Sequence, residues 1–263
     1  MNATLLAFIS IGLYGLGALY EAVSHLKPNR SQNLLPILSG LFALSLHIVT
    51  LSSILSGPNI DAFTAVNSAS IIACFVVAIF VLISLKKPIQ SMLLVVYPLA
   101  IASILGLLIA EPSQEPSALN TGIIAHVTLS ILAYSVLSLS AIQAILVVYR
   151  NRNLKHRQER IWLNKLPPLL VMESVLFDLL RAGTVLLGSA IFLGFLFIDD
   201  LFAQHLAHKS FFSILSFALY STLLFGRRKY GWRGSLAATL TLWGTGSLMV
   251  GFFGTKVVLE AIL

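Results

Sequence analysis

Long apolar runs separated by short polar segments dominate the chain. A helix rises about 1.5 Å per residue, so roughly 20 apolar residues cross the ~30 Å hydrocarbon core of a bilayer. Such windows occur at residues 3–22, 35–55, 64–85, 91–110, 121–149, 182–198, 210–226 and 235–258. The pattern predicts an all-α fold, a polytopic membrane helical bundle with about eight transmembrane helices, in a single integral-membrane domain over residues 1–263.

The composition excludes a soluble globular protein. Apolar residues make up 57% of the chain and charged residues 10%, whereas soluble domains carry roughly 25% charged residues. The mean hydropathy of +0.92 agrees with this assignment. No catalytic nucleophile, phosphate loop or metal-hydrolase motif is found in the sequence, so enzyme activity is not predicted.

The distribution of basic residues predicts the orientation, because Lys and Arg concentrate in short cytoplasmic loops. With the N-terminus outside, 15 of the 17 basic residues fall on the cytoplasmic side, and only Lys209 and Lys256 do not. Six acidic residues lie near the opposite side, namely Asp61, Glu111, Glu115, Asp199, Asp200 and Glu260. Both termini are therefore expected on the periplasmic side.

The net charge of +7 does not indicate a nucleic-acid partner. The positive charge is spread over four loops and lacks an interleaved aromatic surface on which bases could stack. Topology and attraction to anionic lipid headgroups account for it. The one cysteine, Cys74, lies inside the third window, so neither an intramolecular disulfide nor a Cys-x-x-Cys site is expected.

The segment after residue 149 has two interpretations. RNRNLKHRQER forms either a solvated basic loop or a helical extension of the fifth span. Pro167 and Pro168 then break the chain, and MESVLFDLLRAG, with Glu173, is typical of an interfacial helix leading into the sixth span. Glycines in the first and last spans are expected to allow close helix packing, namely Gly12, Gly15, Gly17, Gly244, Gly246, Gly251 and Gly254.

Two histidines, His47 and His126, lie inside apolar windows, where an ionisable side chain is costly without a partner. His47 is roughly 12 Å from the outer end of its window and His126 roughly 8 Å from the outer start of its own. Two neutral imidazoles at similar depth are suited to axial coordination of a haem iron. The alternative is that each ring hydrogen-bonds a Ser, a Thr or a backbone carbonyl. A zinc site is disfavoured, because no third or fourth ligand is evident at that depth.

Near the outer surface, IDDLFAQHLAHKS places His205, His208 and Lys209 before the seventh span. The two histidines are spaced i, i+3 and could share a helix face, but this spacing is common by chance, and the alternative is that both are solvated at the interface. Lys209 is a candidate partner for an acidic group, such as a haem propionate or a lipid phosphate. On the cytoplasmic side, the turn Gly231-Trp232-Arg233-Gly234 is interpreted as an interfacial anchor or a docking site for a partner.

Several segments resemble the cytochrome c assembly protein superfamily, which includes the haem-handling CcsA, CcmC and CcmF proteins, and most of all its YpjD branch of bacterial inner-membrane proteins. The resemblance covers most of the chain and is carried by AHVTLSILAYSVLSLSAIQA from Ala125, LPPLLVMESVLFDLLRAGTVLL from Leu166, AHKSFFSILSFALYSTLLFGRRKYGWRG from Ala207, GFFGTKVVLE from Gly251 and the HIV segment at His47. It implies a multi-pass protein of the bacterial inner (plasma) membrane that binds haem b through His47 and His126, with Lys209 nearby, and acts in haem handling or cytochrome c biogenesis.

One departure from the superfamily pattern bears on this expectation. Haem-handling members carry a tryptophan-rich external loop, and here the aligned stretch is LAHKSFF, which keeps Lys209 and lacks the tryptophans. A retained, buried haem is therefore favoured over transfer to an apocytochrome. The competing hypothesis is a haem-free accessory subunit that binds a transporter or another membrane partner. A transporter is disfavoured, because the spans show neither intramembrane Asp or Glu residues nor a clear inverted repeat.

Overall fold

The computed structural model describes residues 3–24, 33–56, 64–87, 89–110, 121–155, 167–197 and 204–254, and within these ranges it contains helices and no strand. The helices are α1 (Ala3–Ser24), α2 (Leu35–Leu55), α3 (Ala65–Ser84), the 3₁₀ turn η1 (Gln90–Met92), α4 (Leu93–Ile109), α5 (Thr121–Lys155), α6 (Leu169–Phe197), α7 (Gln204–Tyr230), α8 (Gly234–Met249) and the π-helical turn η3 (Val250–Gly254).

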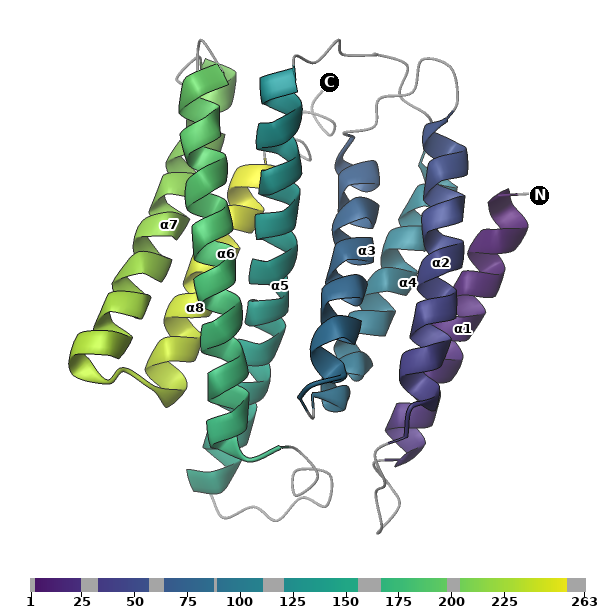
Figure 1. The fold of residues 1–263 in the computed structure, drawn as a ribbon, viewed down its shortest axis with the longest axis horizontal. Coiled ribbons are helices and arrows are strands. Elements are labelled where there is room, and N and C mark those ends of the chain that lie inside the picture. The colour runs from purple at the N-terminus through teal and green to yellow at the C-terminus, as the bar shows by residue number, and fades with distance from the viewer. Residues whose placement is uncertain are drawn as a thin grey trace. The chain divides into compact units, whose positions relative to one another are not determined.

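Eight helices in the described ranges are long and apolar enough to cross a membrane, which confirms the predicted number of spans. They fall into two compact units: unit 1 contains α1 to α4, and unit 2 contains α5 to α8. Within each unit, successive helices run in opposite directions (Figure 1). The predicted single domain and the periplasmic position of both termini stay predictions.

Unit 1 is a ring of helices in which α1 and α3 each pack against α2 and α4. Hydrogen bonds between helices reinforce the apolar packing, as expected where no water competes for polar groups. Ser10 donates to the Ala43 carbonyl across α1 and α2 at 2.8 Å. Tyr97 donates from α4 to the Pro36 carbonyl of α2 at 2.7 Å.

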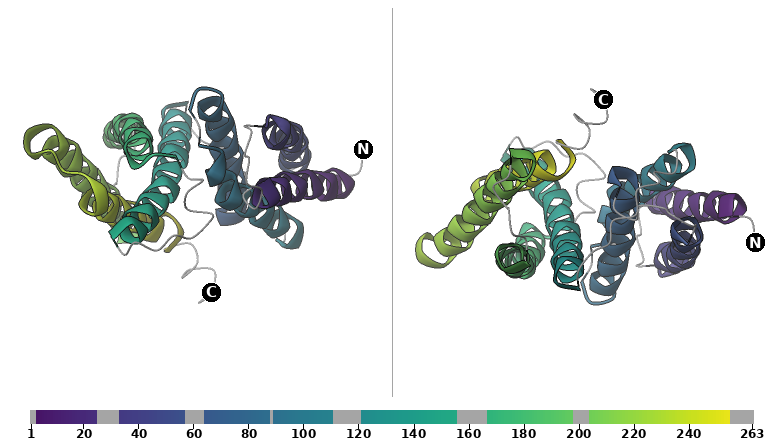
Figure 2. Two further views of the ribbon diagram at one scale, coloured as in Figure 1. Left: turned by 90° about the horizontal axis from the view of Figure 1, so that it is seen from below. Right: turned by 90° about the horizontal axis from the view of Figure 1, so that it is seen from above.

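Unit 2 has the same pattern, since α5 and α7 each pack against α6 and α8. Both ring arrangements can be followed in the end-on views of Figure 2. The Gln143 amide donates to the Met172 carbonyl at 2.8 Å, and Ser216 donates to the Gly244 carbonyl at 2.9 Å. These contacts join α5 to α6 and α7 to α8.

Large apolar side chains cover the outward faces of the helices. Phe8, Leu16, Phe42, Val185 and Trp243 are examples, each more than half exposed. In water such faces would be unfavourable, whereas lipid acyl chains cover them at no hydrophobic cost. The surface therefore agrees with a membrane protein independently of the sequence windows.

Three sequence expectations change with the structure. The interfacial helix predicted before the sixth span is wrong as a separate element, because α6 runs without interruption from Leu169 to Phe197. Arg150 to Lys155 continue α5, so the helical-extension alternative holds for those residues. Glu21 lies in α1 with 1% of its surface exposed, so the statement that the spans lack acidic residues is also wrong.

Close packing by glycine is confirmed at some positions and wrong at others. A Cβ atom at Gly17 or Gly40 would overlap the Tyr97 side chain, which lies against both α1 and α2. Gly12, Gly15 and Gly246 face open space and have no such role. Gly17 of α1 and Gly40 of α2 thus make room for the aromatic ring of Tyr97, which extends from α4 into the core of unit 1.

This contact predicts opposite effects for two Gly→Ala variants. Gly40→Ala is expected to lower the free energy of unfolding by about 1–3 kcal/mol, because the added methyl group forces Tyr97 out of its site. Gly12→Ala should be neutral or stabilising, since it adds helix propensity and meets no neighbour. Thermal unfolding of the detergent-solubilised variants measures both; equal stability of the two would contradict the packing described here.

Candidate functional site

His126 lies in the second turn of α5, in unit 2, and its ring is half-buried. Its Nδ1 atom is 2.7 Å from the Ala190 carbonyl oxygen of α6. A carbonyl oxygen can only accept, so Nδ1 carries the proton and donates it in this bond. In the neutral form of a ring held in this way, the lone pair is at Nε2. Histidines that bind metals typically have this arrangement, with one nitrogen oriented by a carbonyl and the other available to the metal.

An apolar groove of about 540 Å³ lies in unit 2, and His126 is not among the residues that line it. Leu129, one helical turn from His126, and Ser189, directly before Ala190, both contribute to its wall. The remaining lining residues come from α6 and α7, namely Thr184, Val185, Gly188, Phe192, Leu193 and Phe217. The groove can accommodate an apolar group, and Thr184, whose hydroxyl already donates to the Leu180 carbonyl, adds little polarity.

Lys209 lies near the start of α7 and is half-buried. Since α5 and α7 both begin at the same end of unit 2, Lys209 and His126 share that end, which we call the histidine end (Figure 1). His208 is exposed there. The His205 side chain lies outside the described residues, so the predicted shared face with His208 stays a prediction.

His47 lies on α2 in unit 1 and has no exposed surface. Its Nε2 atom is 2.8 Å from the Ser70 hydroxyl of α3, and the Tyr14 ring of α1 meets it edge-on with centroids 6.2 Å apart. Nδ1 is buried and has no hydrogen-bond partner among the described residues, and the Tyr14 hydroxyl is in the same situation. An unsatisfied buried polar atom costs about 1–3 kcal/mol, so this nitrogen is a notable feature of the core of unit 1.

Both histidines therefore make the hydrogen bonds that the alternative to haem binding requires. Each bond engages one ring nitrogen and leaves the second nitrogen for another partner. The bonds therefore do not decide between haem binding and a purely structural role. His47 belongs to unit 1 and His126 to unit 2. The expectation of one haem held by both rings stays a prediction. Within the described residues there is no cluster of three His, Cys, Asp or Glu side chains suited to a metal ion.

At the opposite end of unit 2, which we call the basic end, Glu173 of α6 is only 4% exposed. Its carboxylate accepts a hydrogen bond from the Gly234 backbone N–H at 2.8 Å, so it caps the first turn of α8. The positive end of the helix dipole stabilises a negative charge there. Gly234 has φ of 60°, a conformation that favours glycine. Glu173 thus fixes the start of α8.

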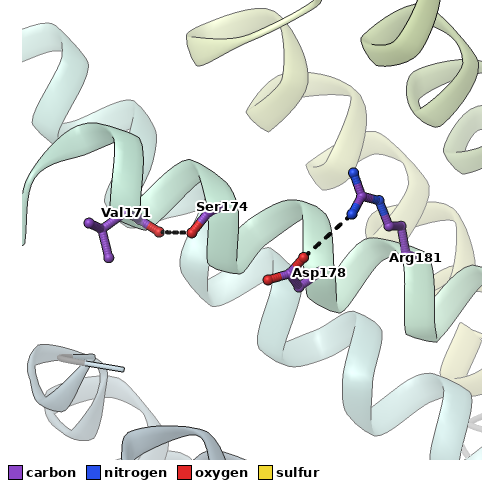
Figure 3. A network of polar contacts seen from close by, with 4 residues as sticks. All are labelled: Val171, Ser174, Asp178 and Arg181. Carbon is purple, nitrogen blue, oxygen red and sulfur yellow. Dashed lines mark hydrogen bonds and ion pairs between the residues drawn. The ribbon is translucent and has the colours of Figure 1, made fainter. Parts of the chain in front are cut away.

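A second acidic residue of α6 has different surroundings. Asp178 pairs with Arg181 at 3.6 Å, and the two side chains are 54% and 66% exposed (Figure 3). One turn closer to the helix start, the Ser174 hydroxyl donates to the Val171 carbonyl at 2.9 Å. Exposed ion pairs of this kind contribute little to stability. Asp178 is therefore a suitable control for Glu173.

Sequence reasoning identified the histidines and the kinds of partner they could have, a Ser, a Thr or a backbone carbonyl, but not which residues these are. Ser70 is one of several small polar residues in the third span, and no local pattern marks it as facing His47. The Ala190 partner is a backbone carbonyl, which every residue carries. The capping role of Glu173 depends on the packing of α6 against the start of α8.

Comparison with known protein families gives one match that covers most of the chain. The family model described as "Cytochrome C assembly protein" matches residues 34–263. That range includes His47, His126 and Lys209. No solved structure matches this chain.

Two curated proteins illustrate the relationship. "Inner membrane protein YpjD" of Escherichia coli (strain K12) is 23% identical over 260 residues, which cover 97% of this chain and 98% of the relative. An "Uncharacterized 28.8 kDa protein in nifR3-like 5'region" of Azospirillum brasilense is 27% identical over 140 residues, 52% of each chain. The first comparison agrees with an inner-membrane protein that spans the membrane several times.

Proposed function

Because this chain belongs to the cytochrome c assembly protein family, we propose that it binds haem b in the inner membrane and acts in haem handling or cytochrome c biogenesis. The observation that carries the proposal is the His126 ring, whose Nδ1 donates to the Ala190 carbonyl at 2.7 Å. This bond orients the imidazole and leaves Nε2 as the atom that would coordinate iron. The proposed role is that of a binding protein and not of an enzyme.

The surroundings of His126 fit a haem in three respects. A groove of about 540 Å³ in unit 2, whose wall includes Leu129 one helical turn from His126, is largely apolar, as the faces of a porphyrin require. Lys209 is at the same end of unit 2 and is the proposed partner of a propionate. The half-buried position of the ring leaves it accessible, in contrast to a fully enclosed core histidine.

In this proposal, each residue has a defined task. His126 supplies the ligand nitrogen, and the Ala190 carbonyl fixes the tautomer of the ring. The groove residues exclude water from the apolar faces of the cofactor. A bound haem would supply an iron centre capable of one-electron chemistry.

His47 is the second proposed imidazole, through its unpartnered Nδ1. Its complete burial and its bond to Ser70 make it less accessible than His126. We therefore expect His47→Ala to change the ligand field of the haem more than the amount bound. If the wild-type protein gives a low-spin spectrum and His47→Ala gives a high-spin one, His47 is supported as an axial ligand. If the two spectra are the same, His47 has a role only in the core of unit 1.

The experiment that tests the proposed function is an absorption spectrum of the detergent-purified wild-type protein. We expect a Soret band, with α and β bands after reduction, and an absorbance that is proportional to the protein concentration. A haem-free preparation that remains haem-free after incubation with haemin would contradict haem binding and would favour the accessory-subunit hypothesis. For the role in biogenesis, loss of the gene should reduce the covalently attached haem of c-type cytochromes, detected by haem staining.

A further inference from the structure

The connection between α7 and α8 at the basic end of unit 2 carries a concentrated positive charge. Arg228, Lys229 and Arg233 are all exposed and lie within six residues of one another. Tyr230, which is 62% exposed, and Trp232 lie between them. We call these five residues the cationic turn.

The cationic turn is held in shape by contacts on its inner side. The Arg227 side chain is directed inward, with its guanidinium 4.4 Å from the centre of the Phe177 ring and Nη1 donating to the Trp232 carbonyl at 3.4 Å. Trp232 packs against Gly226 and stacks on Tyr230, with ring centres 6.0 Å apart. The conformation of the turn is thus set before any ligand binds.

The three exposed cations have no acidic counterpart in the described structure. Glu173, the buried carboxylate of this end, is bound to the Gly234 N–H, and Asp178 pairs with Arg181. None of the ion pairs found among described residues includes Arg228, Lys229 or Arg233. The turn therefore presents a net positive surface that an external anion can neutralise.

The position of the cationic turn indicates which kind of anion neutralises it. It joins two helices long enough to span a membrane, so it lies at the level of the lipid headgroups. The Lys229 ammonium is 5.6 Å from the centre of the Phe225 ring, which is 59% exposed one turn back along α7. A ligand with a negative headgroup and an acyl chain would contact the cations and the aromatic face together.

We propose that the cationic turn is a binding site for the phosphate of an anionic phospholipid. The phosphodiester is held by Arg228, Lys229 and Arg233, and an acyl chain lies along Phe225. This inference is independent of haem binding. It replaces the general attraction to anionic headgroups expected from the sequence with a defined site of three named cations.

The test uses Trp232 as a reporter, in a chain with Trp162→Phe and Trp243→Phe. This chain is reconstituted in phosphatidylcholine nanodiscs that contain a minor fraction of either brominated phosphatidylglycerol or brominated phosphatidylcholine. Brominated phosphatidylglycerol is expected to quench Trp232 fluorescence more strongly at equal mole fraction. Each cation contributes about a fivefold preference, so Arg228→Gln/Lys229→Gln/Arg233→Gln should lower the preference on the order of a hundredfold.

The charge-conserving variant Arg228→Lys/Lys229→Arg/Arg233→Lys is the matched control and should retain the preference. Thermal unfolding establishes that both triple variants are folded. Equal quenching by the two lipids, or a preference that survives the glutamine substitutions, would overturn the proposal. Reversal of the quenching by millimolar inorganic phosphate would likewise overturn the assignment to a lipid and indicate a site for free phosphate.

Discussion

His126→Ala is expected to reduce the haem that co-purifies with the protein at least tenfold. The substitution removes the half-buried imidazole whose Nδ1 is held by the Ala190 carbonyl and whose Nε2 is the proposed iron ligand. Loss of a residue that merely orients a metal ligand costs about 10–100-fold in affinity, so loss of the ligand itself should cost at least as much. The measurement is the pyridine haemochrome absorbance per mole of purified protein.

His208→Ala is the matched control for this prediction. It changes the same residue type in the same unit, at an exposed position on α7. Haem content should stay at the wild-type level in this variant. If both variants lose haem equally, or if neither does, His126 is not the ligand that this account requires.

Glu173→Leu is expected to give the largest loss of stability, about 3 kcal/mol in the free energy of unfolding. The substitution removes a buried carboxylate and leaves the Gly234 N–H without its acceptor. A hydrogen bond to a charged group contributes about 1.5–3 kcal/mol, and the part-buried Gly234 N–H that is left without an acceptor adds to the cost. Glu173→Gln should lose less, because the amide oxygen can still accept from the Gly234 N–H. Thermal and denaturant unfolding in mild detergent measure both variants.

Asp178→Asn provides the comparison on the same helix. Its carboxylate is exposed and pairs with Arg181 at 3.6 Å, an arrangement that contributes about 0–1 kcal/mol. We expect the stability of this variant to remain close to that of the wild type. A Glu173→Leu variant as stable as Asp178→Asn would show that capping of α8 is not important for unit 2.

The sequence predicted the helices well, because hydropathy windows detect the property that places a helix in lipid. The predicted window 35–55 coincides with α2, Leu35–Leu55. The window for α6 began too late, at residue 182, because Glu173, Asp178 and Arg181 lower the local hydropathy. A helix continues wherever its backbone hydrogen bonds are made, whether or not its side chains suit the bilayer core.

The candidate site was predicted only in part. A histidine in an apolar window can be identified from sequence, since its burial needs a reason. Which nitrogen is engaged depends on neighbours from other helices: the Ser70 hydroxyl for His47 and the Ala190 carbonyl for His126. Spacing along the chain does not show which helix faces contact each other, so these partners required a structure.

The central claim, that the free Nε2 of His126 coordinates haem iron, is tested most directly by His126→Gly with exogenous imidazole. Without imidazole, this variant should lose the wild-type Soret band and its reduced α and β bands. When haemin is supplied with it, added imidazole should fill the space left by the side chain and restore that spectrum, while the same addition leaves the wild-type protein unchanged. A His126→Gly variant that shows the wild-type spectrum before any imidazole is added would contradict the account.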